Sequence, residues 1–197
     1  MTTTPLRLAV IQGSTRDGRL GPVVANWLLA HASARPDLTT DLIDLAETPL
    51  PTTFPQLGQA PADPAHRALL AAVSPRLAAA DAFVVVTPEY NHSYPASLKN
   101  AIDWHGTEWH AKPVGFVAYG GFSAGLRAVE HLRGVFAELH AVTIREAVGL
   151  QGVWGQFDAE GKATDPAADA AAKAMLDQLA WWADALREAR TKNPYGS

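Results

Sequence analysis

The hydrophobic positions of the chain form short apolar runs separated by longer amphipathic stretches. Four runs are apolar almost throughout, as expected of strands that are covered on both faces, and a weaker run ends at Asp44. The four strong runs span residues 6–11, 82–86, 114–119 and 141–144, and the weaker one spans residues 40–43. Strands that alternate with helical stretches are typical of a parallel sheet with crossover helices, so we predict an α/β fold.

The stretches between these runs carry apolar residues at helical spacing. The first opens with Gly21 and Pro22, a suitable pair for a helix start. The second opens with Asp63 and Pro64, and we expect its Pro75 to kink the helix or shift its boundary. The predicted helices span residues 22–33, 64–77, 95–106, 124–138 and 166–190. Residues 45–62 hold four prolines and residues 149–165 hold four glycines, which predicts two long irregular connections.

Composition narrows the functional classes. The chain has 197 residues, of which 48% are hydrophobic and 18% are charged, which suits a single globular domain over residues 1–197. A formal net charge of -4 and scattered basic residues argue against nucleic-acid binding. Because the chain has no cysteine, any redox chemistry must come from an organic cofactor. We see no leader and no apolar stretch that could span a membrane, and therefore expect a cytoplasmic protein.

The loop after the first apolar run has the composition of a phosphate-binding loop. Residues 13–22 read Gly-Ser-Thr-Arg-Asp-Gly-Arg-Leu-Gly-Pro, which places glycines, hydroxyls and two guanidinium groups at a helix opening. The loop lacks the spacings of dinucleotide and nucleoside-triphosphate loops and therefore suits a monophosphate. The alternative is a plain helix-capping turn with two solvated arginines.

Two further loops follow predicted strands at the edge of the sheet where ligands bind. In the loop that begins at Thr87, Tyr90 lies between two prolines and beside Glu89 and Asn91, an arrangement that suits a flat heteroaromatic ring. The alternative is that the aromatic residues merely cover the end of the sheet. After the fourth run, paired glycines at 120 and 121 would let backbone amides approach a ring system, although a simple strand-to-helix turn also explains them.

Metal and hydrolase chemistry find no support in the sequence. The histidines at positions 105, 110, 131 and 140 lack the spacing of paired metal ligands, so we predict no metal site. Neither Ser14 nor Ser97 lies in a nucleophile elbow. We assign no residue as a nucleophile or general base.

Taken together, the three loops resemble the NADPH-dependent FMN reductase family over roughly residues 6–145. The most specific part is Pro-Glu-Tyr-Asn at 88–91, followed by Pro95 and then by Leu-Lys-Asn-Ala-Ile-Asp-Trp at 98–104. The resemblance implies a three-layer flavodoxin-like fold with a five-stranded parallel sheet in the order 2-1-3-4-5. It also implies an FMN cofactor, with NADPH or NADH as electron donor and a small acceptor such as a quinone, an azo compound or free flavin.

The resemblance also assigns binding roles to individual residues. By this resemblance the phosphate of FMN would be held by Ser14, Arg16 and Arg19, with the adjoining Leu20 and Gly21. The flavin ring and ribityl chain would lie along Pro88, Glu89, Tyr90 and Asn91, with Gly120 and Gly121 at the other border of the ring. One departure is Arg19, since many family members carry Ser or Asn there. Members commonly form homodimers or homotetramers, which would place Trp104 or Trp109 near a partner subunit.

Two rival interpretations remain open from the sequence. The first is an electron-carrier flavodoxin with no substrate of its own. Such carriers are usually more acidic than this chain and bind phosphate with loops that lack arginine. The second keeps the enzyme but makes flavin a dissociable substrate rather than a held cofactor.

Overall fold

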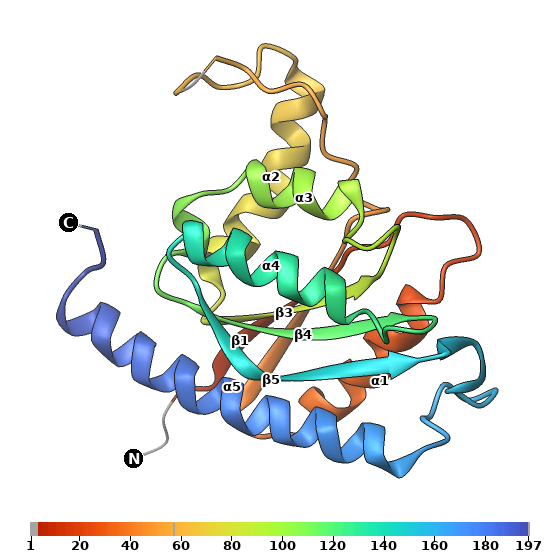
Figure 1. Cartoon of the computed structure of the whole chain (residues 1–197). Coiled ribbons are helices and arrows are strands. Elements are labelled where there is room, and N and C mark those ends of the chain that lie inside the picture. Colours follow the sequence, from red (N-terminus) through yellow and green to blue (C-terminus); the bar gives the residue numbers. More distant parts are fainter. Residues whose placement is uncertain (1–3, 57, 197) are drawn as a thin grey trace.

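Five parallel strands form the central sheet of the computed structural model, which describes residues 4–56 and 58–196. Their order across the sheet is β2-β1-β3-β4-β5, which confirms the predicted topology. The strands are β1 (Leu6–Gln12), β2 (Leu38–Asp44), β3 (Ala82–Pro88), β4 (Pro113–Gly120) and β5 (Val142–Gln151). All carboxyl ends meet at one edge of the sheet, which is the right-hand edge in Figure 1.

Helices cover both faces of the sheet and make the fold three-layered (Figure 1). One face carries α2 (Pro64–Ala79), α3 (Ala96–Asp103) and α4 (Leu126–Glu138). The other face carries α1 (Gly21–Ser33) and α5 (Pro166–Lys192). Two short 3-10 helices, η1 (Thr107–Trp109) and η2 (Val153–Gly155), lie in the connections. Among the described residues, none of the helices has the length and apolarity that a membrane crossing requires.

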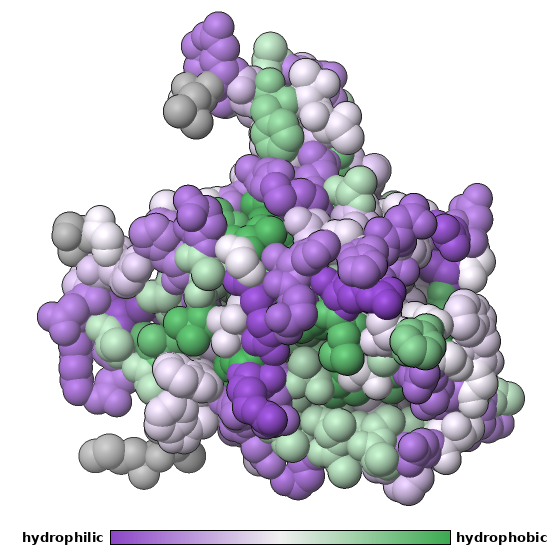
Figure 2. Space-filling view, in the orientation of Figure 1, coloured by the Kyte–Doolittle hydropathy of each residue, from purple (hydrophilic) through white to green (hydrophobic). Residues whose placement is uncertain are grey.

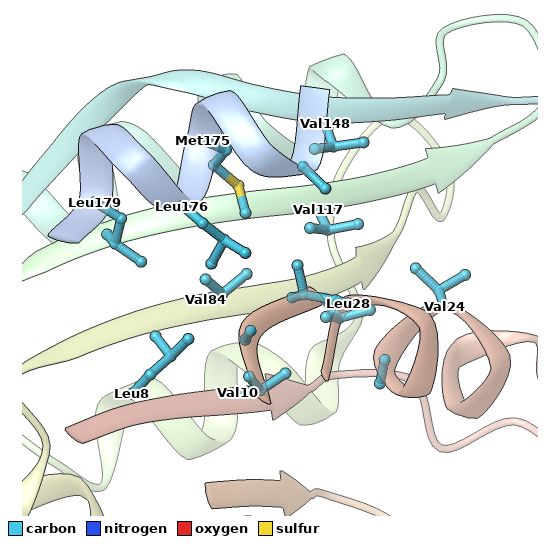
Figure 3. Packing of buried hydrophobic residues seen from close by; sticks show 14 of the residues in the cluster. Leu8, Val10, Val24, Leu28, Val84, Val117, Val148, Met175, Leu176 and Leu179 are labelled. Atoms are coloured by element: carbon cyan, nitrogen blue, oxygen red, sulfur yellow. The ribbon is translucent and has the colours of Figure 1, made fainter. Parts of the chain in front are cut away.

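The apolar runs are continuous because each strand buries both of its faces. Along β1, Leu8 and Val10 belong to the core beneath α1 and α5, and Ala9 and Ile11 to the core beneath α2, α3 and α4. This alternation is the two-residue period of a strand. Figure 3 shows Leu8 and Val10 facing side chains of α1 and α5 in the core beneath these two helices.

Of the two tryptophans expected near a partner subunit, Trp109 belongs to the core beneath α2, α3 and α4. Trp109 is only 1% exposed and packs against the rings of Phe83 and Phe136, so it cannot face a partner subunit. Trp104 is half-buried, and its indole nitrogen donates to the carbonyl oxygen of Pro51 at 2.6 Å.

Strand β5 is much longer than its apolar run. It lies at the edge of the sheet, and its pairing with β4 is irregular: Val114 pairs with Thr143 but Phe116 pairs with Ala147. The additional residues on β5 form a bulge that includes the exposed Arg145. This polar bulge interrupts the apolar pattern, so the predicted strand stopped at residue 144.

Helix α2 continues past Pro75 to Ala79, so the expected shift of its boundary does not occur. Pro75 is exposed, where water can reach the carbonyl group that its missing N–H leaves free. The irregular segment before α2, together with the first turns of that helix, projects from the body of the molecule (Figures 1 and 2).

Candidate functional site

A cavity of about 350 Å³ opens at the carboxyl edge of the sheet. The loops after β1, β3 and β4 form most of its wall, and η2 completes it. Its lining residues are Ser14, Arg16, Gly18, Arg19, Leu20, Pro88, Glu89, Tyr90, Asn91, Tyr119, Gly120, Gly121, Val153 and Trp154. The volume lies within the range of small-molecule sites.

All but one of the residues selected from the sequence line this cavity. The exception is Gly21, which is buried at the start of α1 against the side-chain amide of Gln12. A Cβ atom at position 21 would lie 2.7 Å from Cδ of Gln12. The glycine is therefore needed to make room for Gln12, and a contact between Gly21 and a ligand stays a prediction.

Gln12 and Ser14 organise the loop after β1. The buried side chain of Gln12 accepts a hydrogen bond from the backbone N–H of Ser14 through Oε1 at 2.6 Å. The hydroxyl of Ser14, itself 1% exposed, lies 2.8 Å from the hydroxyl of Tyr90 in the loop after β3. This hydroxyl pair joins two walls of the cavity.

Arg19 is held by an ion pair that the sequence did not reveal. Its guanidinium donates to both carboxylate oxygens of Asp44, at 2.7 and 2.8 Å, and to the carbonyl oxygen of Ser14 at 2.6 Å. Asp44 is the last residue of β2, so the parallel sheet places it beside the end of β1. Because this pair neutralises the charge of Arg19, the residue acts first as a clamp on the loop.

Arg16 has no such partner. Its side chain is exposed, and its guanidinium carbon lies 4.7 Å from the centre of the Tyr90 ring. Within the described part of the chain it forms no salt bridge. Arg16 therefore contributes uncompensated positive charge to the cavity beside the start of α1, where the helix dipole adds to the positive potential.

A tight turn presents the aromatic wall. Tyr90 and Ser93 exchange two backbone hydrogen bonds, at 2.8 and 3.0 Å. The residues between them, Asn91 and His92, have φ values of 48° and 73°, as the central residues of a type I′ turn require. The turn places Tyr90 and Asn91 at the cavity surface.

Glu89 lines the cavity, but its carboxylate is bound elsewhere. The N-cap residue of α4, Gly125, has no side chain to cap the helix, and Glu89 accepts the backbone N–H of Arg127 at 3.1 Å. The same carboxylate accepts from Ser123 at 2.5 Å and from the Arg127 guanidinium at 3.1 Å. Burial alone would raise the pKa of Glu89, but these hydrogen bonds outweigh it and hold the pKa below its usual value.

Sequence reasoning missed Gly18, Tyr119, Val153 and Trp154 as lining residues. Tyr119 looked like one more apolar position of β4, although it immediately precedes the paired glycines. Trp154 lies in a connection expected to be irregular, and its isolated indole in a glycine-rich segment was the only signal. It is 74% exposed in the structure.

Comparison with known proteins gives matches over most of the chain. Residues 6–155 match the family model described as NADPH-dependent FMN reductase. An NAD(P)H-dependent FMN reductase of Schizosaccharomyces pombe is 35% identical over 155 residues, which cover 75% of this chain and 78% of that protein. A probable NADPH:quinone oxidoreductase of Oryza sativa subsp. japonica is 33% identical over 190 residues, 90% of each chain.

A solved structure agrees in fold. The flavoenzyme NAD(P)H:(acceptor) oxidoreductase FerB from Paracoccus denitrificans superposes with a TM-score of 0.73 at 25% identity. The match covers 91% of this chain and 97% of FerB.

Proposed function

Because the chain belongs to the NADPH-dependent FMN reductase family, we propose that the cavity at the carboxyl edge of its sheet holds FMN. The protein is an FMN-dependent oxidoreductase that uses a reduced nicotinamide nucleotide and a small electron acceptor. The chemistry that FMN supplies when bound is acceptance of a hydride and delivery of the electrons to the acceptor. The protein's own residues bind and orient the three reactants.

The phosphate end of FMN lies, in this proposal, against the loop that begins at Ser14. The observation that carries the assignment is the uncompensated charge of Arg16 beside the start of α1. A phosphate group is the ligand that such a helix start and a free guanidinium favour. Arg19 contributes mainly by holding the loop, because Asp44 already binds its guanidinium.

The ring end of FMN lies, in this proposal, between Tyr90 and the paired glycines. Asn91 supplies an amide that can meet the polar edge of a flavin, and Gly120 and Gly121 allow close approach of the backbone. Glu89 supports this wall through α4 and does not offer its carboxylate to the ring.

A flavodoxin-type carrier is the rival from another class, and the curated relatives favour an enzyme.

Two finer features are part of the proposal: the single domain is cytoplasmic, and it assembles as a homodimer or homotetramer. Large apolar side chains exposed beside the cavity, at Phe122 and Trp154, support the assembly. Light scattering of the purified protein tests it, and a monomer would contradict it.

Two measurements test the proposal directly. FMN should bind more tightly than riboflavin or FAD in a fluorescence titration, because the loop at Ser14 suits one terminal phosphate; equal affinity for riboflavin would contradict this. FMN that stays with the protein through purification indicates a held cofactor, whereas a freely exchanging FMN supports a dissociable substrate.

Steady-state kinetics test whether both substrates use one face of the flavin. If one face of the flavin ring packs against the loops after β3 and β4, only its other face is open, and the nucleotide and the acceptor must use that face in turn. Initial rates at several fixed acceptor concentrations should give parallel double-reciprocal lines. Intersecting lines, with evidence that both substrates bind at once, would refute the shared face.

A further inference from the structure

Tyr119 carries a buried hydroxyl that the fold does not use. The residue is 5% exposed at the carboxyl end of β4, and its hydroxyl forms no hydrogen bond with any described residue. Buried polar groups are almost always bonded, so an unpartnered hydroxyl in a site requires an explanation.

The groups that influence the pKa of this hydroxyl belong to the two cavity walls that meet at Ser14 and Tyr90, or are bonded to them. They are Ser14, Tyr90 and the Arg19–Asp44 ion pair. Each of these already has a partner: Ser14 and Tyr90 bond to each other at 2.8 Å, and Arg19 bonds to Asp44. The Tyr119 hydroxyl is therefore left as the unpaired member of a group of three hydroxyls.

The chemical role open to Tyr119 is that of a donor. Burial raises the pKa of Tyr119 above its ordinary value. The phenol is therefore protonated at neutral pH. Although Tyr119 lines the cavity, its hydroxyl itself is buried, which favours a contact with a neighbouring side chain over a direct contact with a ligand.

We propose that Tyr119 is a positioning residue that donates to the Ser14 hydroxyl when a phosphate group occupies the loop. In the free protein Ser14 shares its hydrogen bond with Tyr90. A hydroxyl oxygen accepts while its proton is donated, so Ser14 can donate to a phosphate oxygen and accept from Tyr119 at the same time. A chain that runs from the phenol through Ser14 to the phosphate polarises each bond along it and strengthens the phosphate contact.

This inference rests on the proposed function, because it supposes that the cavity binds FMN by its phosphate. Tyr119→Phe removes the hydroxyl and keeps the packed ring. We expect it to weaken FMN binding about three- to tenfold, the worth of one hydrogen bond, with riboflavin binding unchanged. Tyr195→Phe removes a remote phenol that bonds to His140 and serves as the matched control.

A double-mutant cycle tests whether the effect passes through Ser14. In a Ser14→Ala background the Tyr119→Phe change should have no further effect on the FMN dissociation constant. The melting temperature of the ligand-free protein should not fall in Tyr119→Phe, because the hydroxyl is unpaired there. An equal loss of FMN and riboflavin affinity, an additive cycle or a lower melting temperature would each overturn the inference.

Failure of the inference and failure of the proposed function give different results. Wild-type protein that does not bind FMN contradicts the proposed function itself. Wild-type protein that binds FMN, with Tyr119→Phe indistinguishable from it, contradicts only the role of Tyr119.

Discussion

Replacement of Arg16 by alanine tests the electrostatics of the site most sharply. Arg16 is the lining cation that no described carboxylate neutralises, whereas Arg19 is paired with Asp44. If the phosphate of FMN lies at this loop, Arg16→Ala should weaken FMN binding and leave riboflavin binding unchanged.

The magnitude follows from the exposure of the side chain. A hydrogen bond to a charged group contributes about 1.5–3 kcal/mol. Because Arg16 is exposed, water and salt screen its contact, so we take the lower value of about 1.5 kcal/mol. At about 1.4 kcal/mol for each factor of ten, the expected loss is about tenfold in the FMN dissociation constant.

Flavin fluorescence titrations at low and high salt provide the assay. Added salt should weaken FMN binding by the wild type more than by Arg16→Ala, because the variant has lost the screened contact. Arg145→Ala removes an exposed arginine on β5, outside the cavity, and should behave as the wild type. An unchanged FMN dissociation constant in Arg16→Ala, or an equal loss of affinity for riboflavin, would show that Arg16 does not contact the phosphate.

Three further predictions concern stability. Asp44→Asn should lower the free energy of unfolding by about 1.5–3 kcal/mol, because the partly buried guanidinium of Arg19 loses its charged partner; urea unfolding that matches the wild type would contradict this. Gly125→Ala should lower the free energy of unfolding by at least about 1–2 kcal/mol, because position 125 has a φ of 82° and its Cβ would lie 2.6 Å from a side chain of β4. As the control, Gly134→Ala on the exposed face of α4 should stabilise the protein slightly. Burial lowers the pKa of Lys112 to about 8, so between about pH 8 and 10 the unfolded chain binds a proton that the folded protein has released. In this range the free energy of unfolding of the wild type should rise relative to that of Lys112→Met, by up to about 1.4 kcal/mol per pH unit. Parallel pH profiles of the two proteins would contradict this.

The sheet was predictable because its strands are buried on both faces. Runs such as residues 82–86 have no reason to be apolar throughout unless helices cover both sides of them. Only the beginning of β5 was predicted, because an edge strand with a bulge exposes polar residues such as Arg145, and these interrupt the apolar pattern of a strand. Pro75 did not end α2, because an exposed position tolerates the hydrogen bond that proline removes.

The candidate site was predictable at the level of loops and less so at the level of side-chain partners. Loops that follow parallel strands converge by topology alone, so Ser14, Tyr90 and Gly120 could be placed together from their order in the sequence. The partner of Arg19 could not, because Asp44 ends the weakest strand and nothing local marks its carboxylate as a clamp. Tyr119 was hidden because an aromatic ring inside an apolar run looks like core, and only its hydroxyl distinguishes it.

The capping of α4 by Glu89 divides the rim of the cavity into a part that resists change and a part that tolerates it. Glu89 accepts the backbone N–H of Arg127 in the first turn of α4, so a substitution at position 89 leaves that turn without its cap. Phe122 and Trp154, which are 89% and 74% exposed, have no comparable duty in the fold. A library that varies positions 122 and 154 while keeping position 89 fixed would therefore change the rim of the cavity with little risk to folding.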